Sequence, residues 1–389
     1  MTQQTTGSIV PGKSETLELI FQPAARDSLH GHPRAQDLSS PEIGLAGPGG
    51  VFDVSVSPRA IPVQRETRLT MAAVVQDRYG TAAVLQRRTI DRPDIGDGQV
   101  LVRVRAAGVN IADWAVMCGL PYIARPVYGL RKPKQGVRGT DVAGVVEAVG
   151  SGVRRFKAGD EVFGSADGSY ADYAAASEDE LALKPANLTF EQAATVPMAG
   201  LVALQSLSEV MAGEKVLING AAGGIGTFAV QIAKSRKATV TGVTSTRNVE
   251  MVRSIGADHV IDYTNDDFTQ RAERYDFILD NVSNHSLSDL RAALTPTGTL
   301  VPNGGRFDNH WFASGGRVIA AKALSRFGSK TMKTFLVSMK HDGLLVLKEL
   351  IEAGKVTPVI DRIYPLSEAS QAMSHVGEGH ARGKVAITV

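Results

Sequence analysis

A glycine-rich stretch in the middle of the chain carries the residues best suited to chemistry. It follows a short apolar run, residues 215–218, and precedes a segment with the apolar period of a helix. A turn with few side chains lets an anion approach the helix N-terminus, where free backbone N–H groups and the helix dipole favour negative charge. Strand, glycine turn and helix in this order are typical of the phosphate-binding corner of a dinucleotide fold. The predicted phosphate-binding residues are Ala221, Ala222, Gly223, Gly224, Ile225 and Gly226.

A longer pattern surrounds this turn. Ala221 replaces the first glycine of the usual GxGxxG motif, so the turn alone also fits a glycine-rich turn that binds nothing. Residues 213–234 read GEKVLINGAAGGIGTFAVQIAK, which resembles the signature of the quinone oxidoreductase and ζ-crystallin branch of the medium-chain dehydrogenase/reductases. Residues 139–164 resemble the GroES-like catalytic domain of the same family. The resemblance spans residues 71–389 and implies a nicotinamide cofactor.

The end of the second strand indicates which nicotinamide cofactor binds. An NAD-preferring fold places an acid there, about 20 residues past the glycines. In this chain the first acid is Glu250, inside the next helix, and hydroxyl groups and a guanidinium come before it. These groups suit a 2′-phosphate, so we predict NADPH; alternatively, Arg247 is only a solvated residue at the helix start. The remaining predicted cofactor residues are Thr244, Ser245, Arg247, Tyr263 (from the family resemblance) and Asn281 after the strand at 275–280.

Zinc ligands are missing from the expected positions. Zinc alcohol dehydrogenases of this superfamily need cysteine and histidine ligands in the first domain. Residues 71–213 contain no histidine and one cysteine, Cys118. The resemblance puts Asn110, Thr140 and Asp141 where a zinc enzyme has its catalytic ligands, and the structural lobe is absent. Amide and hydroxyl groups are poor zinc ligands, so we predict no metal site.

Without zinc, the favoured chemistry is hydride addition to an electron-poor acceptor, with hydrogen-bond donors placed at the developing oxyanion. Asn110 is the first candidate donor, because its amide can orient substrate or cofactor; a structural loop amide is the alternative. Tyr122 lies in a loop that lines the cleft in relatives, and it either delivers a proton or walls the cleft. Asp113 is a third candidate, although a turn-capping role is favoured. Cys118 has no nearby histidine and fits a packing role.

The loop at residues 123–135 is longer and more basic than its counterpart in the shortest family members. Arg131, Lys132 and Lys134 lie close together in it. It forms a lid or shapes the acceptor pocket, or it is a solvated loop. The insertion is similar to that of a subgroup including reticulon-4-interacting-protein-like oxidoreductases.

Composition sets the broad class of the protein. The chain has 389 residues, enough for two domains, with 43% hydrophobic and 21% charged residues, as in globular proteins. A net charge of +2 without a basic stripe gives no indication of nucleic-acid binding. One cysteine excludes an internal disulfide and fits a reducing cytoplasm. We expect no membrane span, because no apolar run approaches about 18 residues.

The predicted fold class is α/β, a Rossmann doubly wound parallel sheet plus a GroES-like β-rich catalytic domain. Alternation over residues 100–105 predicts a half-buried strand, and short strands with glycine turns predict a barrel-like unit. After the glycine turn, apolar runs alternate with helical segments, which predicts a parallel sheet. The predicted divisions are residues 1–70, a disordered extension or wrongly chosen start without a secretory signal; 71–195, GroES-like; 196–338, Rossmann; and 339–389, the rest of the catalytic domain.

These observations predict a zinc-independent, NADPH-dependent oxidoreductase that transfers hydride to a quinone or another activated carbonyl acceptor. The alternative is an NADPH-dependent enone or 2-alkenal reductase. A non-catalytic NADPH-binding protein, suggested by crystallin relatives, is a third hypothesis. We expect a small-molecule substrate, no nucleic-acid partner and a cytoplasmic location. The resemblance implies a homodimer joined through the edges of the Rossmann sheets.

Overall fold

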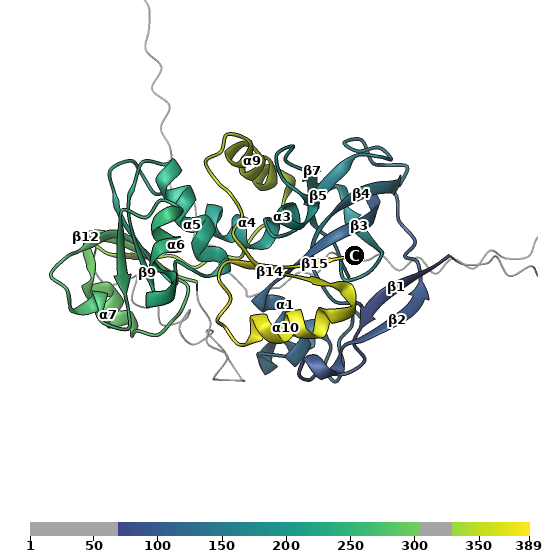
Figure 1. Ribbon diagram of the computed structural model, residues 1–389, viewed down its shortest axis with the longest axis horizontal. Helices are drawn as coiled ribbons and strands as arrows, with labels where there is room; N and C mark the ends of the chain where they lie inside the picture. Colours follow the sequence, from purple (N-terminus) through teal and green to yellow (C-terminus); the bar gives the residue numbers. More distant parts are fainter. Residues whose placement is uncertain (1–68, 304–328) are drawn as a thin grey trace, which may run out of the picture. The chain divides into compact units, whose positions relative to one another are not determined.

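The computed structural model describes residues 69–303 and 329–389, and the fold is given for these (Figure 1). The predicted N-terminal extension, apart from its last two residues, lies outside them. So does the part of the predicted Rossmann domain at 304–328. No helix in the described ranges has the length and apolar character to cross a bilayer.

A six-stranded parallel sheet holds the glycine turn. Its strand order is β10-β9-β8-β11-β12-β13, and all pairings are parallel, which confirms the predicted sheet. The strands are β8 (Lys215–Asn219), β9 (Thr239–Thr244), β10 (His259–Asp262), β11 (Tyr275–Asp280), β12 (Leu294–Pro302) and β13 (Thr331–Met332). The order reverses direction at β8, so the carboxyl ends of β8 and β11 border the switch point where such sheets bind ligands.

Helices precede, connect and follow these strands. They are α4 (Pro197–Ser206), α5 (Gly224–Ser235), α6 (Val249–Ser254), α7 (Leu287–Ala292) and α9 (His341–Glu352), with short 3₁₀ turns η4 (Thr246–Asn248) and η5 (Phe268–Gln270). The apolar period predicts the helix at α5, but α5 buries every residue from Gly226 to Ala233, so it is covered on more than one face. Helix α9 is amphipathic and buries Leu344, Leu347 and Ile351.

A seven-stranded sheet forms the GroES-like part. Its main order is β14-β15-β3-β4-β5-β7, and β6 pairs with β3. The strands are β3 (Gln99–Val109), β4 (Asp141–Val149), β5 (Glu161–Ser165), β6 (Tyr173–Ser177), β7 (Leu181–Leu183), β14 (Ile360–Pro365) and β15 (Lys384–Thr388). In β3, Val102 and Val104 are buried while Arg103 and Arg105 are exposed, which confirms the predicted alternation. Figure 1 shows the C-terminal strands β14 and β15 beside β3, and Val385 pairs with Val109.

Smaller elements complete this part of the molecule. Strands β1 (Thr70–Val75) and β2 (Gln86–Asp91) form an antiparallel pair. The helices are α1 (Ile111–Cys118), α2 (Arg125–Tyr128), α3 (Phe190–Ala194) and α10 (Ala369–Gly377). The 3₁₀ turns are η1 (Ala82–Val84), η2 (Tyr122–Ala124), η3 (Glu178–Glu180) and η6 (Leu366–Glu368). Helix α2 lies within the region that sequence analysis describes as the loop 123–135.

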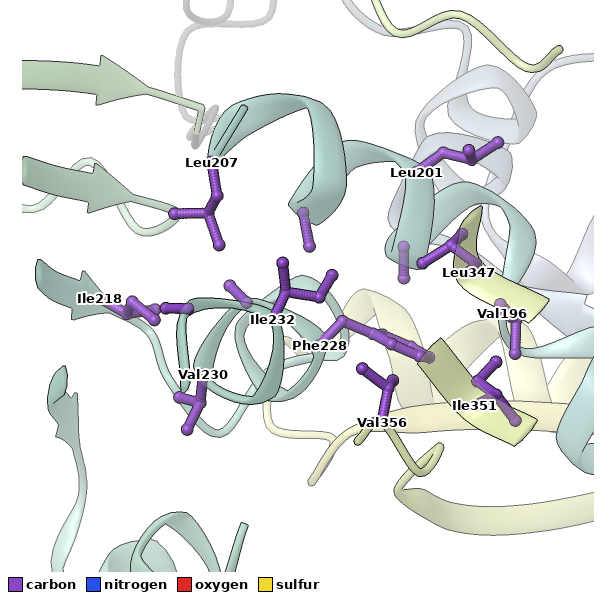
Figure 2. Close-up of a cluster of buried hydrophobic side chains, with 14 of the residues drawn as sticks. Val196, Leu201, Leu207, Ile218, Phe228, Val230, Ile232, Leu347, Ile351 and Val356 are labelled. Atoms are coloured by element: carbon purple, nitrogen blue, oxygen red, sulfur yellow. The ribbon is translucent and has the colours of Figure 1, made fainter. Parts of the chain in front are cut away.

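One buried apolar cluster joins the two sheets. It includes Phe163 of β5 and Ile218 of β8, together with residues of α4, α5 and α9. Figure 2 shows the ring of Phe228 pointing toward Val356 and toward Ile351 of α9. Burying such a cluster stabilises the fold through the apolar area removed from water. It also holds the glycine turn in place against the other sheet. The domain boundaries at 195 and 338 stay predictions.

Candidate active site

The glycine turn leaves space in front of α5. Strand β8 ends at Asn219, and the chain turns through Gly220, which has φ +82°. A Cβ on Gly226 would collide with the Gly220 carbonyl oxygen, so only glycine lets the helix approach the strand so closely. A Cβ on Gly223 would meet nothing nearer than 3.4 Å beyond its chain neighbours. The turn therefore has one glycine fixed by packing and another beside open space at a helix N-terminus, the arrangement that receives phosphates.

The predicted phosphate-binding residues lie together in this region. Ala221 and Ala222 form the turn, Gly223 caps α5, and the helix starts at Gly224. The remaining two belong to the first turn of α5, Ile225 and Gly226. The first N–H groups of a helix have no intrahelical acceptor, so this turn presents donors to an anion.

The C-terminal segment crosses this turn. The Gly383 N–H donates to the carbonyl oxygen of Ala222 at 2.8 Å, and Gly383 forms a parallel bridge with Gly223. A Cβ on Gly224 would lie 2.9 Å from Cδ of Lys384. The aliphatic part of the lysine therefore lies against the first turn of α5.

The predicted 2′-phosphate residues gather at the ends of β9 and β10. Thr244 is buried, and its carbonyl oxygen accepts from the N–H of Tyr263 at 3.0 Å. Ser245 follows Thr244, and the Tyr263 side chain is 58% exposed, open to a ligand. Nη2 of Arg247 donates to the His380 carbonyl oxygen at 2.8 Å, which ties this guanidinium to the C-terminal segment. The structure thus brings the predicted side chains to one edge of the sheet.

A carboxylate that sequence analysis did not consider lies near this edge. Asp262, the last residue of β10, accepts hydrogen bonds from the hydroxyls of Thr246 and Thr264 at 2.6 and 2.7 Å and from Asn265 at 2.9 Å. The Thr246 hydroxyl lowers the pKa of Asp262. Its oxygens are thus engaged within the turn that follows β10.

Two asparagines occupy the carboxyl ends of the central strands. Asn219 donates through Nδ2 to Oδ1 of Asp280 at 2.9 Å. Asn281 accepts through Oδ1 from Nδ2 of Asn303 at 2.9 Å. Its own Nδ2 is buried and has no hydrogen-bond partner among the described residues. An unpaired buried donor is costly, so this amide fits a ligand that supplies an acceptor at the switch point.

Asn110 presents a second unpaired donor. It lies between the end of β3 and the start of α1, and it is 6% exposed. Its Oδ1 accepts a hydrogen bond from Nζ of Lys384. Its Nδ2 is buried and meets no acceptor in hydrogen-bond geometry among the described residues, although the amide lies close enough to Asp141 to lower the pKa of that carboxyl group. A fixed amide with one free N–H group is suited to an oxygen on substrate or cofactor.

Lys384 and Asp141 form a buried charged pair beside Asn110. Nζ of Lys384 also donates to the Val109 carbonyl oxygen at 3.0 Å and lies 4.0 Å from Oδ2 of Asp141. Burial lowers the pKa of Lys384. Burial raises the pKa of Asp141 to about 7, although the ammonium opposes this effect. Asp141 is fully buried and accepts from the Met198 N–H at 3.2 Å, which anchors it to α4.

Asp113 organises the donors around the start of α1. Its Oδ2 accepts from the Asn110 N–H at 3.0 Å and from the Tyr170 hydroxyl at 3.4 Å. Its Oδ1 accepts from the Thr140 hydroxyl at 3.1 Å. Burial raises the pKa of Asp113, and the charge of buried Arg138 is among the effects that lower it. The capping alternative for Asp113 is therefore what the contacts support, because the carboxyl group meets protein donors.

Tyr122 lies apart from this hydrogen-bonded cluster. It begins the short turn η2, and the Arg125 guanidinium lies over its ring, 4.4 Å from the ring centroid. The same guanidinium is 4.9 Å from the ring centroid of Tyr79. These contacts fit the wall alternative; they do not identify a proton donor. In the basic loop, Arg131, Lys132 and Lys134 are exposed, as the solvated alternative expects.

Asn110, Thr140 and Asp141 are the side chains that the resemblance puts where related zinc enzymes have their catalytic ligands. Thr140 is hydrogen-bonded to Asp113, and Asn110 to Lys384. Across 69–303 and 329–389, no cluster of three or more histidine, cysteine, aspartate or glutamate side chains has the arrangement of a metal site. An ammonium beside the cluster is also an unsuitable neighbour for a cation.

Sequence reasoning missed Lys384, Tyr170 and Arg138, and it treated Asp141 only as an unsuitable zinc ligand. These side chains come from distant segments, so no spacing connects them. One signal was available: the apolar run Val385-Ala386-Ile387, typical of a buried strand, directly follows Lys384. A lysine in a buried strand needs a partner, and that need points to a buried carboxylate or amide.

Comparison with known proteins agrees with the fold. The profile of the alcohol dehydrogenase GroES-like domain matches residues 96–205. A second profile, described as zinc-binding dehydrogenase, matches residues 255–387. The mitochondrial NAD(P)H oxidoreductase RTN4IP1 of Bos taurus is 33% identical over 367 residues, covering 86% of this chain and 93% of the relative.

Two further relatives carry more specific names. The chloroplastic NADPH-dependent alkenal/one oxidoreductase of Arabidopsis thaliana is 34% identical over 335 residues, covering 82% of this chain and 79% of the relative. The solved structure of the quinone oxidoreductase from Coxiella burnetii is 31% identical, with a TM-score of 0.73, and covers 82% of this chain and all of that one. The resemblance that residues 139–164 and 213–234 suggest is therefore confirmed. The chain belongs to the medium-chain dehydrogenase/reductase family, among relatives that are quinone and alkenal/one oxidoreductases.

Proposed function

We propose that this protein is an NADPH-dependent oxidoreductase that reduces a quinone or another activated carbonyl compound. The observation that carries the proposal is the unpaired Nδ2 of Asn110, a buried donor held in place from its oxygen side. Reduction of a quinone or enone builds negative charge on a carbonyl oxygen, and a fixed donor stabilises that charge without reorganisation. The relatives named as quinone and alkenal/one oxidoreductases support this class of acceptor.

The residues present fit the cofactor. The open space at Gly223 and the N-terminus of α5 would receive the pyrophosphate. Thr244, Ser245 and Arg247, with Tyr263 beside them, would hold the 2′-phosphate, because guanidinium and hydroxyl groups donate to phosphate oxygens. Asn281 would supply a donor at the switch point. Bound NADPH supplies the hydride.

The chain's own residues have limited roles in this chemistry. Asn110 donates to the carbonyl oxygen, and the buried surroundings exclude water. A quinone takes up one hydride and one proton to give the hydroquinone, and an enone takes up the same pair to give the saturated carbonyl compound. The enone is the second candidate acceptor, supported by the alkenal/one relative.

A panel assay tests the function. Initial rates of NADPH oxidation are measured with 1,4-naphthoquinone, 2-cyclohexenone and a 2-alkenal, each corrected for the rate without protein. We expect a higher kcat/KM for the quinone, and a kcat at least about 100-fold lower for Asn110→Ala. Asn265→Ala, in an exposed turn, is the control and should keep the wild-type rate. Tight NADPH binding with no turnover on any acceptor would support the non-catalytic hypothesis instead.

The homodimer and the cytoplasmic location are also proposals. The dimer rests on the family resemblance, and the location rests on the single cysteine. The bovine and Arabidopsis relatives are named as mitochondrial and chloroplastic, so the location needs its own test. Light scattering of purified protein measures the oligomeric state. Fractionation of cells followed by immunoblotting measures the location.

A further inference from the structure

Lys384 spans the two halves of the site. Its aliphatic part lies against Gly224 at the start of α5, yet its ammonium points away from the glycine turn. Nζ meets the Val109 carbonyl oxygen, Oδ1 of Asn110 and, at 4.0 Å, the carboxylate of Asp141. The side chain is 4% exposed. A lysine so completely engaged with protein acceptors has little capacity left for a phosphate.

The chemistry of the ammonium decides how the Asn110 amide is oriented. An ammonium group has only donors, so it contacts the amide through Oδ1 and never through Nδ2. In this orientation the N–H side of the amide lies near Asp141, whose pKa it lowers. If the amide turned over, Nδ2 would face the ammonium, and two groups that only donate would oppose each other. Lys384 therefore selects the orientation in which Oδ1 faces the ammonium and Nδ2 lies on the opposite side of the amide.

We propose that Lys384 is a positioning residue for catalysis, which acts by fixing the Asn110 amide with Nδ2 directed to the acceptor oxygen. This inference rests on the proposed function, since it assigns Asn110 the donor role. Because Lys384 also packs against Gly224 and follows Gly383, which bonds to Ala222, the same strand end connects the cofactor turn with the donor. When a second residue holds a donor in place, losing that residue lets the donor shift. A shift of even about 1 Å lowers the reaction rate steeply.

The kinetic test uses Lys384→Met, which keeps the side-chain length, and Lys384→Gln, which keeps a donor for Oδ1. We expect Lys384→Met to lower kcat with 1,4-naphthoquinone by about 10- to 100-fold and Lys384→Gln by less. The Kd for NADPH, measured by titration calorimetry, should change less than about threefold. The control is Lys234→Met at the other end of α5, which removes a lysine paired with Asp258.

A double-mutant cycle separates an action through Asn110 from an independent one. In the Asn110→Ala background, Lys384→Met should cause little further loss of kcat, because the group that it orients is already gone. If the double variant instead lost kcat by the product of the two single-variant factors, the proposal would be overturned. A NADPH Kd raised more than about tenfold with kcat retained would also overturn it, since Lys384 would then be a phosphate ligand.

A spectroscopic readout keeps the inference testable apart from turnover. In protein labelled with ¹⁵N-asparagine, the Asn110 side-chain resonance is assigned by its loss in Asn110→Ala. Lys384→Met should move that resonance, and Lys384→Gln should move it less, while Lys234→Met leaves it in place. An unmoved resonance in a folded Lys384→Met variant overturns the positioning role. Absence of turnover in the wild type with the resonance moved would instead count against the proposed function.

Discussion

The cofactor side of the site and the Asn110 side differ in where their polar groups come from. At the glycine turn they are main-chain N–H groups, supplied by residues consecutive in the chain between Ala221 and Gly226. Around Asn110 they are buried side chains with charge, held by Lys384, Asp141 and Asp113. A main-chain site needs only the right backbone path, whereas a buried charged cluster needs all of its members at once. The two sides should therefore respond differently to substitution.

The largest expected effect is on the Asn110 side, from Asp113→Ala. This change leaves the Asn110 N–H and the Thr140 hydroxyl without their acceptor, and it leaves the Tyr170 hydroxyl with only the Gly108 carbonyl oxygen at 3.5 Å. Because each orphaned buried donor costs free energy, we expect the free energy of unfolding to fall by about 3–5 kcal/mol. Urea denaturation measures it, with Asp266→Ala, which removes an exposed ion pair, as the control. If Asp113→Ala and Asp266→Ala lowered the free energy of unfolding equally, the expected sensitivity of the Asn110 side would be contradicted.

A second effect concerns the dependence of stability on pH. The folded pKa of Asp141 is about 7, against an ordinary value of 3.8, so between about pH 5 and about pH 7 the folded chain holds a proton that the unfolded chain has released. The contribution of Asp141 to the free energy of unfolding therefore falls as the pH rises through that window, by about 1.4 kcal/mol per pH unit.

Asp141→Asn removes this titration and keeps an oxygen for the Met198 N–H. Between about pH 5 and about pH 7, the free energy of unfolding of the wild type should fall by about 2–3 kcal/mol relative to that of Asp141→Asn. Urea denaturation at several pH values measures the difference, and parallel curves would contradict it.

On the cofactor side, two glycines in one turn should behave differently. Gly226→Ala forces a Cβ against the Gly220 carbonyl oxygen, so we expect a loss of about 2 kcal/mol in the free energy of unfolding and weaker NADPH binding. Gly223→Ala has room for its Cβ, so stability should hold while the added methyl group weakens NADPH binding. Thermal unfolding and calorimetric titration of both variants separate packing from binding.

The smallest expected effect is on cofactor choice. Arg247→Ala should raise the Kd for NADPH about tenfold and leave the Kd for NADH nearly unchanged, because only NADPH carries the 2′-phosphate. The control is Arg253→Ala, which removes an exposed ion pair with Glu250 on the next helix. Equal losses for both nucleotides would remove the phosphate role.

The same contrast explains what the sequence can predict. The glycine turn, its strand and its helix are local, so a motif and a hydrophobic period predict them, and the parallel sheet follows from the alternation of elements. The sequence also gives Asn110 as a candidate donor and a capping role for Asp113. The orientation of the amide was not predictable, because Lys384 and Asp141 approach it from separate strands, β15 and β4. Tyr170 and Arg138 were missed for the same reason.

The hydrogen bond from Lys384 to the Val109 carbonyl oxygen joins positions 275 residues apart. Closing so long a loop must precede completion of the Asn110 side, whereas the glycine turn bonds to Val243 of β9 and lacks only its bond to Gly383 before the C-terminal segment arrives. During synthesis, the glycine turn can therefore form on the ribosome before strand β3 pairs with β15. A nascent chain halted before β15 should accordingly contain the turn and lack the finished donor.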